Sequence, residues 1–368
     1  MPLKIASLPG DGIGPEVVAA AFDVVDAAAP ADEFTYEKTE FPFGAEHYIK
    51  TGHILSDEDV QAFRAFDAIM LGAVGGQPND PRLAGGVIEK GILLKLRFDL
   101  DQYINLRPVK LYPGIETPIK GKGPDEIDFV CVRENTEDLY CGLGGIMRKG
   151  TLQEVANQTM VATRFGVERC VRYAFELAYA RKQQGFRGQL TLVHKTNVLT
   201  FAGDTWHRAF REIAAEYPEV QTGYHHVDAC CMYMVQSPEV YDVIVVPNMF
   251  GDIITDLGAA IAGGMGIAAS GNLNPDPTNN APSMFEPVHG SAPDIAGQNK
   301  ANPIAAIDSM GLLLRETGRI KGDAAAVKVG DRIGAAVQKV TPSFTGKRLD
   351  RSGYSTTDVT KLVIDALG

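Results

Sequence analysis

The chain of 368 residues is long enough for two domains or one large α/β unit. Its composition, 45% hydrophobic and 22% charged, is ordinary for a soluble globular enzyme, and its net charge of −11 argues against nucleic-acid or anionic-membrane binding. The five cysteines include an adjacent pair but no C-x-x-C spacing, which argues against a disulfide framework or a zinc site. With neither a signal peptide nor a membrane-length apolar stretch expected, the sequence indicates a reduced, cytoplasmic protein.

The amino-terminal stretch predicts a strand, a glycine-rich turn and a helix. The strand covers 4–8, the turn covers 9–14, and Pro15 occupies the first helical position. The glycines of the turn run G-D-G-I-G, whereas a dinucleotide-binding fingerprint requires G-x-G-x-x-G. The sequence therefore argues against an ordinary Rossmann fold, although such a turn can still lie against a ligand phosphate.

The next segment predicts two helices separated by a strand and a loop. Ser56, with Asp59 three residues on, is an N-cap for a helix through Phe66, and a strand follows over 68–72. A loop rich in Gly, Pro and Asn then extends to Gly86. A second helix is expected over 88–97, continuing until the proline that follows Arg107 ends it.

The middle of the chain repeats a strand followed by a helix, which predicts α/β architecture with a substantial parallel sheet. The strands are expected at 129–132, 189–194, 224–228 and 243–247, and later helices at 303–317, 324–340 and 356–367. Parallel sheets bind ligands at the carboxyl ends of their strands. The side chains that lie there are Arg133, Lys195, Asp228 and Asp252.

Asp252 and Asp256 follow a buried strand and are expected at i and i+4 on one helical face. Two carboxylates this close favour a bound cation, and hard oxygen ligands suit Mg²⁺ or Mn²⁺. Asp228 is a candidate third ligand, which would leave positions open for substrate oxygens and water. For an isolated pair of this kind, two solvated carboxylates on an exposed turn are the commoner explanation.

Three arginines and two proton-transfer candidates accompany these aspartates. Arg97, Arg107 and Arg133 have the forked geometry that grips a carboxylate, although each alone is more often structural. Lys195 is a candidate base and Tyr140 a candidate proton donor. The alternatives are a surface lysine at a strand end and a core aromatic.

Six ordered motifs make the chain resemble the β-decarboxylating dehydrogenases, the isocitrate and isopropylmalate dehydrogenase family. These motifs are Leu93-Leu-Lys-Leu-Arg97, Asn105-Leu-Arg-Pro108, Arg133-Glu-Asn-Thr-Glu137, Lys195-Thr-Asn197, Gly251-Asp-Ile-Ile-Thr-Asp256 and Glu286-Pro-Val-His-Gly-Ser-Ala-Pro-Asp-Ile-Ala-Gly297. The resemblance implies a two-domain α/β fold with a large mixed sheet flanked by helices. It places 1–102 and 258–368 in a larger domain with the NAD-binding loops, and 103–257 in a smaller domain. It also implies a homodimer whose active sites mix residues of both subunits.

The resemblance also implies roles for individual residues. The three arginines would hold the carboxylate that is later lost, and Asp252 and Asp256 would bind the metal with Asp228 of the partner subunit. Lys195 of the partner subunit would be the base, and Tyr140 would assist protonation. The residues implied for NAD binding are Glu286, His289, Gly290, Ser291, Ala292, Asp294 and Asn302. Asp294 favours NAD, because a carboxylate there accepts hydrogen bonds from the ribose hydroxyls and repels the 2′-phosphate of NADP.

The substrate is expected to be 3-isopropylmalate. Ile92, Leu93, Leu94 and Val198 would form an apolar wall that suits an isopropyl group. The stretch Arg133-Glu-Asn-Thr-Glu137 is more similar to the isocitrate and tartrate members, and Lys90 has the reach for a distal carboxylate. Tartrate or D-malate, homoisocitrate and isocitrate therefore stay as alternatives, as does a non-catalytic regulatory subunit. The segment 341–356 departs from the family's commoner tail and supports no assignment.

Overall fold

The computed structural model describes residues 1–344 and 353–368, and its contacts divide the chain into two compact units. Unit 1 comprises Met1–Gln102, Lys110–Pro124 and Ala259–Gly368, and unit 2 comprises Tyr103–Val109 and Asp125–Gly258. Residues 110–124, which the sequence division assigns to the smaller domain, thus lie in the unit formed by the chain ends. Half of the tail segment 341–356, residues 345–352, lies outside the described residues.

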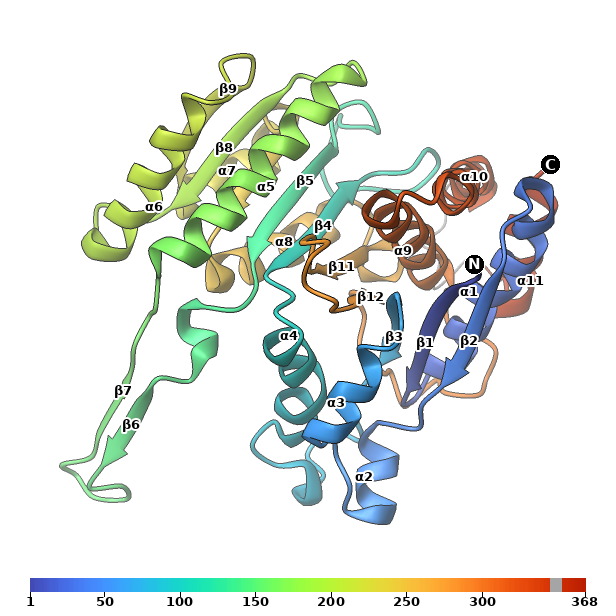
Figure 1. The fold of residues 1–368 in the computed structure, drawn as a ribbon, viewed down its shortest axis with the longest axis horizontal. Helices are drawn as coiled ribbons and strands as arrows, with labels where there is room; N and C mark the ends of the chain where they lie inside the picture. Colours follow the sequence, from blue (N-terminus) through green and yellow to red (C-terminus); the bar gives the residue numbers. More distant parts are fainter. Residues whose placement is uncertain (345–352) are drawn as a thin grey trace. The chain divides into compact units, whose positions relative to one another are not determined.

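The strands of unit 1 form a mixed arrangement in the order β2-β1-β3-β12-β11 (Figure 1). Their bounds are Leu3–Gly10 (β1), Tyr36–Glu40 (β2), Ala68–Ala73 (β3), Ala269–Leu273 (β11) and Ser283–Pro287 (β12). The pairs β1–β2, β1–β3 and β12–β3 are parallel, and only β11–β12 is antiparallel. Every residue of β3 is buried, as expected for a strand covered on both faces.

Helices cover the strands of unit 1. They are Gly14–Ala28 (α1), Ala45–Thr51 (α2), Asp57–Phe63 (α3), Lys95–Asp99 (α4), Ile304–Lys321 (α9), Ala324–Val340 (α10) and Thr356–Ala366 (α11). Helix α9 is buried along most of its length and packs against β11, β12, α1 and α10. The expected N-cap at Ser56 is confirmed, and Ser56 forms a capping box with Asp59, although α3 ends three residues before Phe66.

The stretch from Glu89 to Lys110 corrects one expectation. A π-helix covers Glu89–Leu94 and α4 ends at Asp99, after which the chain forms strand β4, Ile104–Lys110, and no longer continues as a helix. Asp101 has a φ of 47°, in the left-handed region, which ends the helix. Arg107 therefore lies within a buried strand, and Pro108 is accommodated there without ending a helix.

The strands of unit 2 follow the order β4-β5-β10-β8-β9, with β5 at Asp128–Glu134, β8 at Gln189–His194, β9 at Gln221–His226 and β10 at Val243–Val246. The helices are Arg164–Gln183 (α5), Thr200–Ala214 (α6), Val227–Gln236 (α7) and Asn248–Ile261 (α8). Strand β10 runs parallel to both β5 and β8, and β8 runs parallel to β9. The expected α/β architecture, with a mixed sheet flanked by helices, is confirmed.

The register of these parallel strands brings their carboxyl ends to one edge. Val246 pairs with Arg133, Val245 pairs with Leu192, and His194 pairs with His226. The side chains that follow the strands therefore start from the same edge of unit 2, as the sequence predicts.

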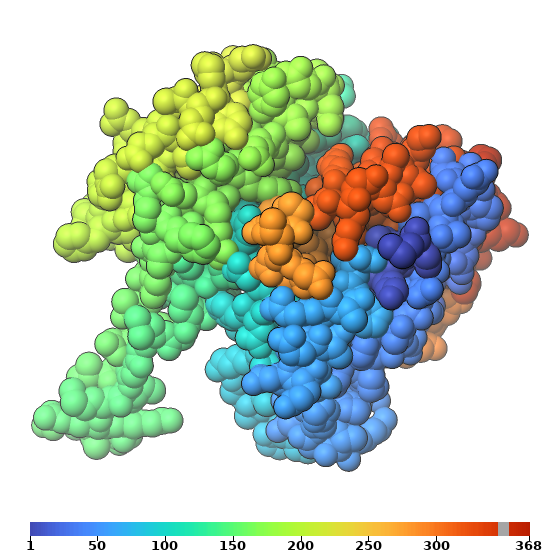
Figure 2. Space-filling model, in the orientation of Figure 1, coloured from blue at the N-terminus to red at the C-terminus, as the bar shows by residue number. Residues whose placement is uncertain are grey.

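A hairpin that the sequence does not predict projects from unit 2 (Figures 1 and 2). Its strands, Gly144–Met147 (β6) and Val155–Gln158 (β7), pair antiparallel, and every residue in them is exposed. Ile146, Met147 and Val155 are each more than half exposed, so the hairpin carries apolar surface that nothing in unit 2 covers.

Among the described residues, no helix is both long and apolar enough to cross a membrane.

Candidate functional site

Arg133 is the buried centre of the candidate site in unit 2. It lies at the end of β5 with its side chain 1% exposed. Its Nε and Nη2 donate to Asn248 Oδ1 at 3.0 and 2.7 Å, and its Nη1 donates to Asp252 Oδ1 at 2.6 Å. A buried guanidinium requires acceptors on its donors, and these two residues of α8 supply them.

Tyr140 completes the surroundings of Asp252. It belongs to a 3₁₀ turn, Asp138–Cys141, and its hydroxyl donates to Asp252 Oδ2 at 3.1 Å. The Arg133 guanidinium carbon lies 5.2 Å from the centre of the tyrosine ring. Both carboxylate oxygens of Asp252 are therefore oriented while its side chain stays 42% exposed. Asp256 is exposed one turn further along α8, so the expected i and i+4 placement on a helix is confirmed.

Gly251 is required by the close approach of Arg133 to α8. A Cβ at this position would lie 2.5 Å from Arg133 Cγ and 2.8 Å from its Cβ. The alkyl part of a buried side chain has no room to move away. Gly251 thus allows the Arg133 side chain to pack directly against the first turn of α8.

Lys195 and Asp228 form a separate pair at the same edge of unit 2. Lys195 follows β8, Asp228 lies in the first turn of α7, and Lys195 Nζ donates to Asp228 Oδ1 at 2.6 Å. The neighbouring ammonium lowers the pKa of the Asp228 carboxyl. Within the described part of the chain, no three His, Cys, Asp or Glu side chains come together as a metal site. Asp228 therefore does not join Asp252 and Asp256 within one chain, and its expected role across a subunit boundary stays a prediction.

The other two predicted arginines are both buried. Arg97, in unit 1, donates from Nη2 to Glu286 Oε1 at 3.1 Å, and Asn272 Nδ2 donates to the same oxygen at 2.8 Å. Arg107, in unit 2, donates from Nε to Asn105 Oδ1 at 2.7 Å. That Arg97, Arg107 and Arg133 together bind one substrate carboxylate stays a prediction.

The apolar wall expected before Arg97 is narrower than the sequence suggests. Ile92 is 1% exposed and belongs to the hydrophobic core of unit 1, so it is not available to a ligand. Leu93 and Leu94 are partly exposed on the π-helix, and Leu93 also packs against that core. In unit 2, Val198 is 66% exposed between β8 and α6.

Asp11 organises the loops at the carboxyl ends of the unit 1 strands. It is 4% exposed, and its carboxylate accepts from the backbone N–H groups of Ala45 (2.7 Å), Glu46 (3.0 Å) and Gly75 (2.9 Å). It therefore caps α2 from a distant turn, since Gly44 supplies no side chain of its own. Sequence reasoning missed Asp11, although its place between the glycines of G-D-G-I-G was a signal.

The predicted NAD-binding segment packs directly against this turn. Ser291 accepts at its carbonyl oxygen from Ile13 N–H at 2.8 Å, and a Cβ on Gly12 would lie 2.0 Å from that oxygen. Glu286, in β12, accepts a hydrogen bond from Arg97, and Asn302 Nδ2 donates to Gly266 O. His289 is partly buried. Gly290 and Asp294 are exposed, and Ala292, beside the buried Ser291, has a φ of 39°.

A cavity of about 540 Å³ lies along the loop that follows β3. Its lining includes Gly75, which Asp11 holds, together with Asn79, Leu83 and Ile88. A Cβ built on Gly75 would lie 3.4 Å from Ser291 Oγ, so the cavity adjoins the predicted NAD-binding segment within unit 1.

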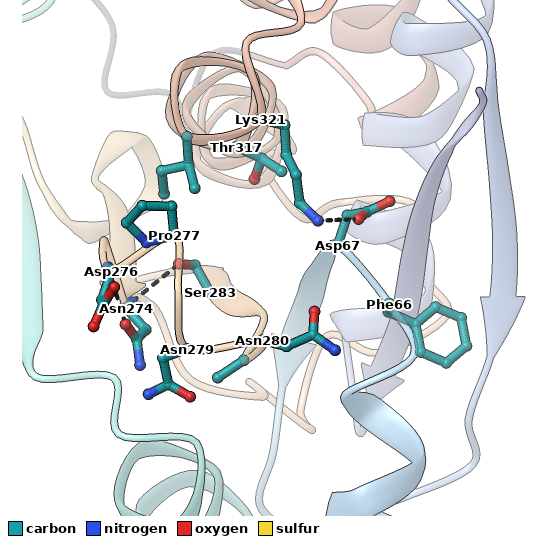
Figure 3. A pocket seen from close by; sticks show the side chains of 12 residues that line it. Phe66, Asp67, Asn274, Asp276, Pro277, Asn279, Asn280, Ser283, Thr317 and Lys321 are labelled. Carbon is teal, nitrogen blue, oxygen red and sulfur yellow. Dashed lines mark hydrogen bonds and ion pairs between the residues drawn. The ribbon is translucent and has the colours of Figure 1, made fainter.

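A second hollow, of about 80 Å³, lies at the amino ends of β3 and β12 (Figure 3). Two contacts join residues of its lining: Lys321 Nζ bonds to Asp67 at 2.6 Å, and Asn274 N–H donates to Ser283 Oγ at 3.1 Å. None of the residues predicted to act on substrate, metal or NAD lines it.

Comparison with known proteins shows which family the chain resembles over nearly its whole length. The family profile described as isocitrate/isopropylmalate dehydrogenase matches residues 4–363. The 3-isopropylmalate dehydrogenase of Clavibacter sepedonicus is 54% identical over 99% of this chain and 98% of its own. That of Clavibacter michiganensis is 55% identical over 89% of this chain and 93% of its own. The crystal structure of isocitrate dehydrogenase from Methylococcus capsulatus, 32% identical, superposes with a TM-score of 0.83 over 99% of both chains.

We expect Gly251→Ala to destabilise the protein, although alanine favours helices over glycine. The added methyl group would collide with the buried stem of Arg133, and such overpacking costs about 1–3 kcal/mol. Urea unfolding measures the free energy, with Gly334→Ala in α10 as the control. At Gly334 the atom nearest to the added methyl group is the flexible guanidinium end of Arg315. We therefore expect no decrease in the free energy of unfolding. Equal behaviour of the two variants would contradict this role of Gly251.

Proposed function

Because the chain belongs to the isocitrate/isopropylmalate dehydrogenase family, we propose that it catalyses the oxidative decarboxylation of (2R,3S)-3-isopropylmalate to 2-oxoisocaproate in leucine biosynthesis. NAD and a divalent metal would serve as its cofactors. The observation that carries the proposal is the near full-length identity of 54% with a 3-isopropylmalate dehydrogenase. The partly exposed Leu93 and Leu94 support it, since an apolar surface suits an isopropyl group.

The residues present fit a hard divalent cation. Asp252 and Asp256 offer carboxylate oxygens at i and i+4 on the exposed side of α8. Mg²⁺ or Mn²⁺ takes such ligands and keeps positions for substrate and water. We assign the third carboxylate to Asp228 of the partner subunit. When bound, the metal would polarise the C2 oxygen of the substrate, and NAD would supply the hydride acceptor.

The residues of the chain itself would position the substrate and move the protons. Arg97, Arg107 and Arg133 would bind the carboxylate that leaves as CO₂ by forked hydrogen bonds. Lys195 of the partner subunit would take the proton of the C2 hydroxyl. Tyr140, whose hydroxyl already points at Asp252, would deliver a proton to the carbon that has lost CO₂.

The residues of unit 1 also fit NAD. A side chain at Gly12 would collide with the Ser291 carbonyl, so glycine lets the predicted NAD-binding segment lie directly against the turn. No atom lies within 4 Å of a Cβ built on Gly290, so the segment is open to a ligand at that residue. The exposed Asp294 would receive the adenosine ribose and exclude NADP.

Exposed apolar side chains on unit 2 support a homodimer. Met232 and Val235 on α7 are 57% and 46% exposed, and Ile253 on α8 is 50% exposed. The hairpin β6–β7 adds further uncovered apolar surface. A twofold interface over α7 and α8 would bring the Lys195–Asp228 pair of one subunit to Asp252 and Asp256 of the other.

The alternatives differ in what they require of the site. A distal carboxylate or second hydroxyl, as in isocitrate, homoisocitrate, tartrate or D-malate, needs a polar partner, and Lys90 is the exposed candidate on the π-helix. A non-catalytic regulatory subunit would not need Lys195 and all three aspartates, which the chain retains.

We expect 3-isopropylmalate to be the best substrate of a panel that includes isocitrate, D-malate and tartrate. Burial of an isopropyl group is worth roughly 1.5–3 kcal/mol, or about one to two decades in kcat/KM. Initial rates with NAD and Mn²⁺ measure this ratio. An equal or higher kcat/KM for D-malate or tartrate would overturn the choice of substrate.

We expect Asp252→Asn to abolish Mn²⁺-dependent turnover while the protein stays folded. The variant keeps the shape of the side chain but loses a hard anionic ligand. Asp204→Asn, an exposed aspartate on α6 paired with Arg208, is the matched control and should retain activity. Full activity of Asp252→Asn at saturating Mn²⁺ would exclude the metal assignment.

We expect a strong preference for NAD over NADP, which Asp294→Lys should erode by at least about tenfold, or 1.4 kcal/mol. Asp294→Asn removes the repulsion without adding a positive charge, so its preference should be intermediate. The ratio of kcat/KM for the two cofactors is the measurement. A wild-type enzyme that uses both cofactors equally would show that Asp294 does not face the ribose.

A further inference from the structure

Asp138 is a buried carboxylate with an unusual backbone conformation. It is 2% exposed, and its φ of 68° lies in the left-handed region that residues other than glycine rarely adopt. Aspartate and asparagine tolerate this region better than other side chains do. The roles argued above for the metal, the substrate and NAD do not use this residue.

The Asp138 side chain caps the helix that carries the metal-binding aspartates. Its Oδ2 accepts from Met249 N–H, in the first turn of α8, at 2.8 Å. The first N–H groups of a helix have no partner within the helix, so an acceptor from elsewhere stabilises that end. Asn248 strengthens the same junction, since its Nδ2 donates to Glu137 O at 3.3 Å.

The junction joins two parts of the candidate site. Asp138 begins the 3₁₀ turn that carries Tyr140, and α8 carries Asp252. The Tyr140 hydroxyl reaches Asp252 Oδ2 across that junction at 3.1 Å. Asp138 adopts its left-handed φ at the start of the turn, and from there its carboxylate reaches Met249 N–H of α8.

We propose that Asp138 is a positioning residue, which fixes α8 against the Tyr140 turn and thereby sets the affinity of Asp252 and Asp256 for the divalent metal. The proposal rests on the proposed function, in which these two aspartates bind Mg²⁺ or Mn²⁺. Asp138 itself binds neither metal nor substrate, and it acts through the first turn of α8.

The test compares Mn²⁺ affinity, measured from the EPR signal of free Mn²⁺, in wild type, Asp138→Asn and Asp138→Gly. Asparagine keeps an acceptor oxygen and tolerates the left-handed backbone, so its affinity should stay within about threefold of wild type. Glycine adopts the left-handed backbone without strain but removes the carboxylate that accepts from Met249 N–H. This variant should bind Mn²⁺ about tenfold more weakly.

Asp323→Gly is the matched control. Asp323 caps α10 in unit 1 by accepting from Ala325 and Ala326 N–H, and its loss should lower the thermal midpoint without changing Mn²⁺ affinity. This separates a weakened metal site from a weakened fold. Unchanged affinity in Asp138→Gly, or an equal loss in Asp323→Gly, would overturn the proposal.

Two further readouts keep the outcomes distinct. If the wild type fails to bind Mn²⁺, the proposed function is wrong at its metal site. If Asp138→Gly does not fold, hydrogen–deuterium exchange in wild type and Asp138→Asn tests whether Asp138 caps α8. Slow exchange at the Met249 amide in both supports the cap, and fast exchange there in the folded wild type overturns it.

Discussion

The candidate site depends on the hydrogen-bond acceptors of one buried, positively charged side chain. Arg133 is almost fully removed from water, and an unpartnered guanidinium there would cost several kcal/mol. Asn248 and Asp252 supply the acceptors, and both belong to the first turns of α8. The helix must therefore start directly over the end of β5, and Gly251 is the residue that permits this approach. The position of Asp252, and with it the proposed metal site, follows from that constraint.

Buried carboxylates that accept backbone N–H groups organise both units. Asp11 in unit 1 joins the glycine turn, the start of α2 and the loop after β3, which borders the larger cavity. Asp138 in unit 2 joins the Tyr140 turn to α8. In each case a single side chain replaces the missing cap of a helix and fixes a loop beside the proposed ligand. Such contacts hold loops without filling the space that a ligand needs.

Local patterns in the sequence predicted part of this arrangement. The N-cap at Ser56 and the helical spacing of Asp252 and Asp256 depend on a few neighbouring residues, and both predictions were confirmed. The convergence of strand ends in unit 2 followed from the parallel pattern and is visible in the register.

Features set by distant contacts were missed. Residues 101–107 were expected to continue a helix, but the chain makes a left-handed turn at Asp101 and then forms the buried strand Ile104–Lys110. Ile92 was placed on the substrate wall because helical spacing alone could not show that it packs into the core. The hairpin β6–β7 has few local signals, and Asp11 and Asp138 act on residues far away in sequence.

We propose that each active site is built from two chains, since Asp252 and Asp256 lie apart from the Lys195–Asp228 pair within each chain. Co-expression of Lys195→Ala and Asp252→Asn chains with different tags tests it most directly, since each homodimer should be inactive. Sites shared between subunits leave one intact site in every mixed dimer, so random pairing should restore about a quarter of wild-type activity. Purified mixed dimers that stay inactive would rule out a shared site, because each site would then draw all its residues from one chain.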